Sequence, residues 1–242
     1  MSARAGEKAA CAVSGKVVDG GALCNIALAE RLDAGKYSEA DRAAASAVAR
    51  SVIENKKAID DALEQVTDLQ RCKKQVRKIW RIGASRLMYT DMAGAKAVSS
   101  AVDICRAVGK GAQSGYINDT LRALSRHDIV WPEEVLENIA VKYSWPYWFC
   151  AQMVDDFGLE FARDFLLYRE QSPVSLRVNP MKASRNTLLE QMDGAQPSPL
   201  DDDGLLVRMS NAAGTDQYKH GLYSLQGTGR MIASRHGLAN GL

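Results

Sequence analysis

The chain has 242 residues, with 31 Lys or Arg against 29 Asp or Glu, and 46% of its residues are hydrophobic. These values are ordinary for a soluble globular protein. The five cysteines are far apart and show no C-x-x-C spacing, so neither a disulfide framework nor a zinc knuckle is indicated. No uncharged run approaches the roughly 18 residues that a membrane helix needs. We therefore expect a cytoplasmic protein with no membrane partner.

The charge is distributed unevenly along the chain. Residues 1–130 carry 21 Lys or Arg and 15 Asp or Glu, whereas residues 131–242 carry 10 and 14. This asymmetry indicates that the basic N-terminal part, which we call the front, binds a polyanion, and that the C-terminal part, which we call the back, has a different function. The expected secondary structure also changes at Trp131-Pro132, because the residue before a proline is biased away from helical conformation. We expect two domains, spanning residues 1–130 and 131–242.

The front shows only helical periodicity, with no strand alternation up to about residue 126. Ser38 and Asp41 have capping-box spacing at the start of one helix. Glycine breaks separate others, and about seven helices are predicted in total. The front is therefore expected to be a helical bundle, which makes the fold mainly α.

The back is expected to be a small α+β module. Helical patterns cover residues 133–142, 145–156 and 159–170. Val174–Val178 then alternates with period two and predicts the first strand. A short helix over 187–192, a loop over 196–203 and strands over 204–209 and 221–226 follow.

The most telling stretch is Arg71–Arg86, which contains seven Lys or Arg and no acid. Its apolar positions share one face of the predicted helix: Val76, Ile79, Trp80, Gly83 and Leu87. Four basic positions share the opposite face: Lys74, Arg77, Lys78 and Arg81. Rigidly spaced charges of this kind suit an RNA phosphate backbone. The alternative is the solvated face of a surface helix.

Four further residues are weaker candidates for RNA contact. Arg4 and Lys8 lie on the first predicted helix, where they also hint at an organelle transit peptide that nearby acids argue against. Arg177 and Asn179 share one side of the first strand and could contact RNA phosphate or sugar. Equally, these two side chains could bond a neighbouring loop.

Other chemistry is poorly supported. The glycines between residues 109 and 115 follow no strand, so a helix connection is favoured over a nucleotide loop. The three histidines have no His or Cys at ligand spacing, so no metal is expected. Asp201–Asp203 reads as a solvated turn rather than a cation site. Cys150 lies in an apolar helix, where an inert core thiol is expected, and no catalytic residue is assigned.

Several motifs carry a resemblance to known families. Val76–Gly83 reads VRKIWRIG and Gly115–Arg126 reads GYINDTLRALSR. In this order they resemble the NusB-like helical domain, in which an I-L-R-L-G helix precedes a V-N-A-V-L-R helix. Ser172–Asn179 reads SPVSLRVN and Gly221–Gln226 reads GLYSLQ. These resemble the linker-region strands of bacterial 16S rRNA cytosine-C5 methyltransferases of the B type, the Sun/Fmu family.

The resemblance implies rRNA as the partner. The family's catalysis needs a Pro-Cys pair and a Gly-rich loop that holds S-adenosylmethionine, and neither occurs in this sequence. Gly227-Thr228 and Ser99-Ser100 also replace the family's Asp-Glu and Asn-Glu pairs. We therefore expect an RNA-binding chain without its own catalytic domain, inactive alone. A cofactor, S-adenosylmethionine, is expected only where the missing C-terminal domain is present.

Two alternatives remain open. The bundle resembles antitermination factors as well, and could dock a ribosomal or transcription-complex protein. The chain could also be the front of a true methyltransferase that has been cut short. The last strand and Met231–His236 would pack against the missing catalytic domain in the family that the chain resembles, so we expect an exposed apolar edge there and a tendency to self-associate.

Overall fold

The computed structural model describes residues 3–168, 173–209 and 212–239. Contacts divide the chain into two compact units, residues 1–168 and 169–242, which are described separately. Within the described ranges, no helix is both long enough and apolar enough to cross a membrane.

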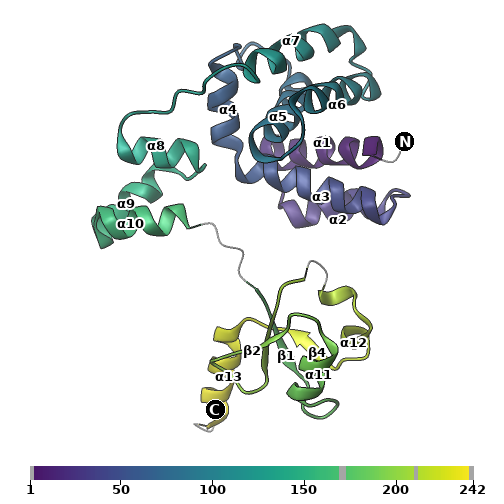
Figure 1. Ribbon diagram of the computed structural model, residues 1–242, viewed down its shortest axis with the longest axis vertical. Helices are drawn as coiled ribbons and strands as arrows, with labels where there is room; N and C mark the ends of the chain where they lie inside the picture. The colour runs from purple at the N-terminus through teal and green to yellow at the C-terminus, as the bar shows by residue number, and fades with distance from the viewer. Residues whose placement is uncertain (1–2, 169–172, 210–211, 240–242) are drawn as a thin grey trace. The chain divides into compact units, whose positions relative to one another are not determined.

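The first unit contains helices and no strand among its described residues (Figure 1). Its helices are α1 (Ala3–Gly20), α2 (Cys24–Asp33), α3 (Glu39–Glu54), α4 (Lys56–Glu64), α5 (Lys74–Tyr89), α6 (Gly94–Ala107), α7 (Ser114–Leu124), α8 (Val135–Lys142), α9 (Tyr147–Phe157) and α10 (Leu159–Leu167), with a 3-10 turn η1 (Gly111–Gln113) before α7. The helical periodicity of the front is confirmed. Gly109 has a φ of +74° after α6, as expected for a helix connection.

The capping box at the start of α3 is also confirmed. The Ser38 hydroxyl accepts a hydrogen bond from the Asp41 N–H at 3.1 Å, and the Asp41 carboxylate accepts one from the Ser38 N–H at 3.3 Å. This exchange satisfies two N–H groups that the first turn of a helix otherwise leaves unpaired.

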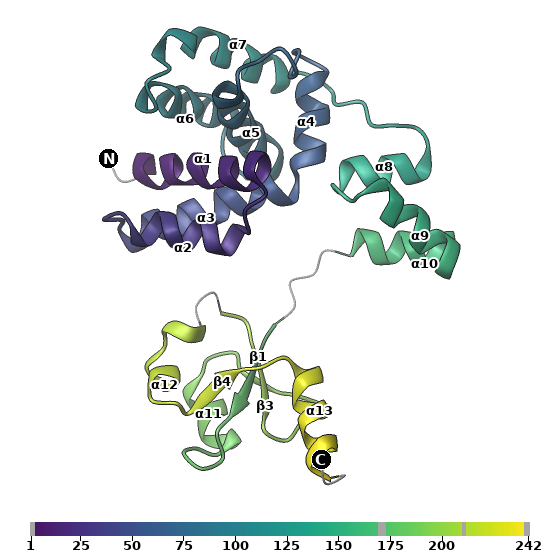
Figure 2. The ribbon, with the colours of Figure 1, turned by 180° about the vertical axis from the view of Figure 1, so that it is seen from behind.

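Helix α5 lies among α1, α3, α4, α6 and α7 (Figures 1 and 2). Val76, Ile79 and Trp80 are buried in the main core, as the apolar pattern predicts. A Cβ atom on Gly83 would lie 2.4 Å from Leu121 Cδ1. Glycine thus allows α5 and α7 to approach closely. With helices on several sides, α5 has less open surface than a helix that packs on one face only.

The first compact unit extends to Tyr168, so it contains α8–α10 as well as the bundle expected over residues 1–130. The reason is that α8 packs against α4. The Ser144 hydroxyl, just after α8, accepts a hydrogen bond from the Ala58 N–H in the first turn of α4 at 3.2 Å. The Gln65 side chain also donates to the Val130 carbonyl at 2.9 Å and accepts from the Val130 N–H at 3.0 Å. The residues around Trp131-Pro132 therefore connect helices of one unit.

The second unit contains a four-stranded antiparallel sheet in the order β2-β3-β1-β4. Its strands are β1 (Val174–Val178), β2 (Gln196–Pro197), β3 (Gly204–Val207) and β4 (Tyr223–Leu225). Its helices are α11 (Arg185–Gln191), α12 (Asp216–Lys219) and α13 (Thr228–Ala239), with a 3-10 turn η2 (Ala212–Gly214). In register, Leu176 of β1 faces Leu205 on one side and Leu225 on the other. The mainly α fold with a small α+β part is confirmed.

The end of the second unit only partly matches the exposed apolar edge expected there. Strand β4 is an edge strand, and Leu225 is 46% exposed. Met231 on α13, however, is buried, and the side chain of His236 lies outside the described residues. Self-association stays a prediction.

The aspartates at 201–203 form a turn that an arginine neutralises. Arg235 of α13 lies 2.9 Å from Asp201 and 3.2 Å from each of Asp202 and Asp203. The guanidinium supplies the positive charge that a bound cation would bring. This geometry supports the expectation of a turn rather than a cation site.

Candidate nucleic-acid interface

The exposed part of the predicted basic helix is its beginning. Helix α5 starts at Lys74, so Arg71 and Lys73 precede it. Lys73 and Lys74 are exposed, and the Arg71 side chain is 89% exposed beside Asp68. An ion pair this exposed is weak and leaves the arginine able to change partners. These residues form a basic surface that a polyanion can reach.

Arg81 does not face solvent, and the expectation that it does is wrong. It is buried, with Nε 2.7 Å from Asp60 Oδ1 and Nη2 2.9 Å from Asp60 Oδ2. Lys56 Nζ lies 2.9 Å from the same carboxylate. Asp60 and Lys56 both belong to α4. This helix covers the face of α5 that a helical projection leaves open. Arg81 is therefore held in a bidentate structural ion pair.

Two more basic side chains of α5 form ion pairs within the bundle, and a third is half-buried. Lys78 lies over α1, with Nζ 3.4 Å from Asp19 and a side chain only 22% exposed. Arg86 is buried and pairs with Glu7 at 2.5 Å. Arg77 is half-buried, and its Nε has no hydrogen-bond partner among the described residues. The solvated face expected on α5 thus reduces to its first turn and part of Arg77.

The weaker candidates fall into both units. Lys8 is exposed on α1, whereas the side chain of Arg4 lies outside the described residues. Arg177 is half-buried on β1. Asn179 donates from Nδ2 to the Gly221 carbonyl at 3.1 Å and accepts from the Met181 N–H at 3.2 Å. Its amide therefore bonds neighbouring loops, which was one of the two alternatives expected.

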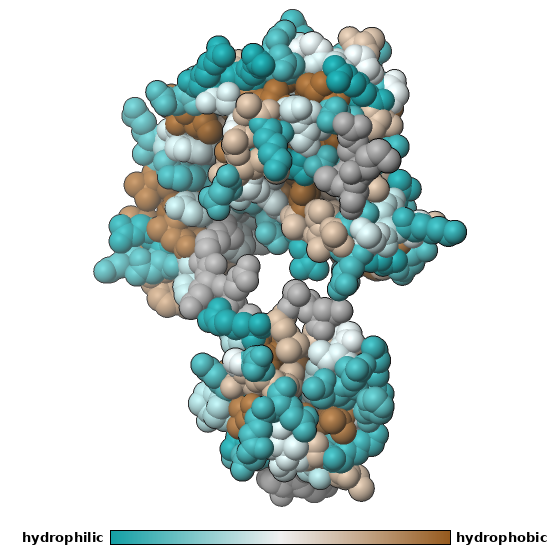
Figure 3. Space-filling model, turned by 45° about the vertical axis from the view of Figure 1, so that its right-hand side comes forward, coloured by the Kyte–Doolittle hydropathy of each residue, from teal (hydrophilic) through white to brown (hydrophobic). Residues whose placement is uncertain are grey.

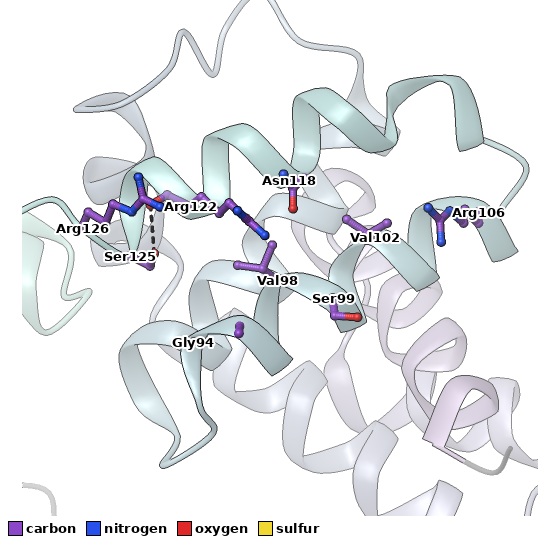
Figure 4. A pocket seen from close by; sticks show the side chains of 10 residues that line it. Gly94, Val98, Ser99, Val102, Arg106, Asn118, Arg122, Ser125 and Arg126 are labelled. Carbon is purple, nitrogen blue, oxygen red and sulfur yellow. Dashed lines mark hydrogen bonds between the residues drawn. The ribbon is translucent and has the colours of Figure 1, made fainter.

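A polar groove between α6 and α7 brings together residues that sequence reasoning missed. It encloses about 600 Å³. Its polar lining consists of Ser99, Arg106, Asn118, Arg122, Ser125 and Arg126. Figure 4 shows Arg122 and Asn118 reaching from α7 toward Val98 of α6, with Arg126 and Arg106 at opposite ends.

The arginines of this groove are available to a ligand. Arg122 and Arg126 are exposed, and neither forms an ion pair with another described residue. Arg106 is 3.9 Å from Asp103, in a pair whose arginine side chain is 66% exposed. A guanidinium presents several N–H donors in one plane and matches a phosphate well. We refer to Arg106, Arg122 and Arg126 as the arginine groove.

A local signal for this groove was present in the sequence. Arg122 and Arg126 stand four residues apart, which places both on one side of a helical pattern, although α7 itself ends at Leu124 and Arg126 lies in the turn that follows. Both also lie within the GYINDTLRALSR segment. The sequence did not show that this face borders α6 or that Arg106 lies at its far end.

Nucleophilic and metal chemistry find no support among the described side chains. No group of three or more His, Cys, Asp or Glu in this part of the chain is placed to hold a metal ion. Cys150 is fully buried, and burial raises the pKa of its thiol. Burial also raises the pKa of Cys11 to about 11. Both thiols are therefore protonated at neutral pH, and Cys150 fits the inert core thiol expected at that position.

Comparison with known proteins defines the class of the helical bundle. Residues 12–126 match the model of the NusB family. This range runs from α1 to just after α7 and includes α5 and the arginine groove. These residues form a NusB-family domain.

The wider chain is similar to ribosomal RNA small subunit methyltransferase B proteins. It is 25% identical over 226 residues to the probable enzyme of Bacillus subtilis, covering 88% of this chain and 50% of that protein. It is 27% identical over 209 residues to the Xanthomonas campestris pv. campestris protein, covering 82% and 46%. The chain thus spans about half the length of these curated relatives. The crystal structure of PH0851 shares the fold, with a TM-score of 0.64 and 16% identity over 90% of this chain and 52% of that one.

Proposed function

We propose that this chain binds ribosomal RNA, with the arginine groove and the exposed Arg71–Lys74 segment contacting phosphates. The observation that carries the proposal is the groove itself, where three guanidiniums line one hollow and two of them have no ion-pair partner among the described residues. The names of the relatives supply the kind of RNA.

The groove is better suited to RNA than the middle of α5. Arg81 and Arg86 are already neutralised by the carboxylates of Asp60, which is partly buried, and Glu7, which is buried. Reaching a phosphate would break those pairs and leave Asp60 or Glu7 uncompensated, which is costly in a low-dielectric environment. Arg122 and Arg126 need only exchange water and counterions for phosphate oxygens. Release of those counterions drives binding and makes it depend on salt.

Within a methyltransferase-type activity, we assign this chain the binding and positioning of RNA in the cytoplasm. We assign none of the described residues a role in methyl transfer. We therefore expect no incorporation of radiolabelled methyl groups from S-adenosylmethionine into small-subunit rRNA by this chain alone. Incorporation above a no-protein control would contradict that assignment.

The RNA-binding proposal is tested by reversing charge in the groove. The double variant Arg122→Glu and Arg126→Glu is compared with Arg31→Glu and Arg50→Glu, which changes the net charge equally at exposed positions of α2 and α3. Binding of small-subunit rRNA fragments is measured against salt concentration. The groove variant should bind more weakly, and its logarithmic salt slope should fall by about one for each lost phosphate contact. The α2–α3 variant should retain most of the affinity and slope.

Two results would refute the proposal. One is native-like RNA affinity in the groove variant at every salt concentration. The other is an equal loss in both double variants, since this would mean that RNA responds to net charge rather than to the groove.

A further inference from the structure

An exposed row of aromatic side chains lies on α9 and α10. Phe157, Phe161 and Phe165 are 58%, 53% and 49% exposed. Their ring centroids are 5.2 Å and 6.4 Å apart in succession, and the second pair is stacked. Brown apolar surface is visible on the helical unit among teal polar residues in Figure 3. A contiguous exposed apolar surface of this kind is typical of an interaction site.

A row of carboxylates runs beside the aromatic row. Asp156, Glu160 and Asp164 each immediately precede one of the three phenylalanines, and all three are exposed. A hollow of about 500 Å³ is lined by members of both rows, together with Gly158 and Leu159. We refer to the two rows together as the acidic aromatic surface.

The negative charge of the back of the chain is concentrated in residues 131–168, the part of the back that contains this surface. Residues 131–168 carry seven Asp or Glu and only two Lys or Arg, whereas residues 169–242 carry seven and eight. One of those two basic residues, Arg163, lies 3.8 Å from Asp164, and both side chains are more than half exposed. Such a pair is weak, so the surface keeps most of its negative charge.

The fold does not require these phenylalanines to be aromatic. Helix α10 uses its other face for packing, with Ala162 and Leu166 buried. The Trp145 indole N–H donates to the Leu166 carbonyl at 3.0 Å and holds the end of that helix. The core of α8–α10 therefore does not need the aromatic row. A ligand that covers the row explains its exposure better.

We propose that the acidic aromatic surface binds a basic amphipathic segment of another protein. Apolar side chains of that segment would pack on the phenylalanine row, while its Lys or Arg side chains would pair with the carboxylate row. Cations can also lie over the phenylalanine faces. Charge complementarity excludes an RNA backbone here, because its phosphates would meet three carboxylates. The proposal does not depend on RNA binding, which uses residues of other helices.

The test uses a fluorescein-labelled helical peptide of 14 residues with leucine on one face and arginine on the other. Its binding is followed by fluorescence anisotropy. Two control peptides replace arginine with glutamate or leucine with serine, and neither should bind measurably. The full chain should bind the leucine–arginine peptide.

Two double variants separate the rows. Phe161→Ser with Phe165→Ser removes aromatic surface, and Glu160→Lys with Asp164→Lys reverses charge; each should weaken peptide binding at least tenfold. Leu23→Ser with Ile26→Ser removes exposed apolar surface at the N-terminal end of α2 and should change binding less than twofold. All changed side chains are exposed, and circular dichroism confirms folding. Binding of a structured rRNA fragment should be unaltered in both test variants.

Equal peptide affinity in the native chain and both test variants would overturn the proposal. So would an Arg-to-Glu peptide that binds as tightly as the basic one. Loss of rRNA binding in the Phe161→Ser and Phe165→Ser variant would also overturn it, because the aromatic row would then stack on bases. The Arg122→Glu and Arg126→Glu variant should still bind the peptide, so failure of the two proposals can be distinguished.

Discussion

Replacing Arg81 separates a structural arginine from an RNA-binding one. In the Arg81→Ala variant, Asp60 loses both bonds of its bidentate partner, at 2.7 and 2.9 Å. Removing one member of a buried ion pair costs about 3–5 kcal/mol when the other is left uncompensated. Here Lys56 remains 2.9 Å from Asp60, and the Asp60 side chain is 17% exposed. We therefore expect a loss of about 2–3 kcal/mol in the free energy of unfolding.

Urea unfolding followed by circular dichroism at 222 nm measures this change, with the m-value as a check on two-state behaviour. A loss of this size corresponds to a fall in Tm of about 5–10 °C for a unit of this length. Arg122→Ala is the matched control, because a surface substitution normally changes stability by no more than about 0.5 kcal/mol. Arg81→Met combined with Asp60→Leu should recover much of the loss, since it removes both buried charges.

The two arginines should show opposite phenotypes. At a temperature where both variants remain folded, Arg81→Ala should keep native RNA affinity and Arg122→Ala should lose part of it. The reasoning fails if Arg81→Ala is as stable as the native chain and binds RNA more weakly. That result would mean that Arg81 reaches solvent and RNA in solution.

Three further results are expected. Gly83→Val should destabilise the helical unit by about 1–3 kcal/mol in urea unfolding, because even its Cβ would lie 2.4 Å from Leu121, and native stability would contradict this packing. A thiol reagent at neutral pH should modify only Cys24 and Cys72 in the folded chain, and all five cysteines once guanidinium unfolds it. Mass spectrometry counts the modified thiols, and rapid modification of the three buried thiols in the folded chain would contradict their burial. Arg235→Ala should release α13 from the aspartate turn and speed proteolysis within residues 228–239, and an unchanged cleavage rate would show that the ion pairs do not hold it.

Local features of the fold followed from the sequence. The apolar spacing of α5, the Ser38 capping box and the alternation of Val174–Val178 all depend on residues within a few positions of one another. Helical and strand periods determine which of these side chains share a face, whatever the rest of the chain does. The mainly α front and the α+β back were therefore predictable.

The domain boundary was not predictable in the same way. Trp131-Pro132 lies in the non-helical stretch between α7 and α8, and the charge does change sign near it. Whether the following helices belong to the front depended on contacts between distant residues, such as Ser144 with Ala58. The structure also places the excess negative charge on α8–α10 of the first unit rather than on the sheet of the second.

The periodicity and charge of the sequence by themselves predicted a helical front with a strongly basic fifth helix, and its motifs carried the resemblance to the NusB-like domain. Only the tertiary structure decided which of its charges are free, because a helix inside a bundle has neighbours on several sides and one projection cannot show them. Asp60, Asp19 and Glu7 come from other helices and neutralise Arg81, Lys78 and Arg86. The same packing leaves Arg122 and Arg126 on an open groove, since α6 and α7 place no carboxylate against them among the described residues.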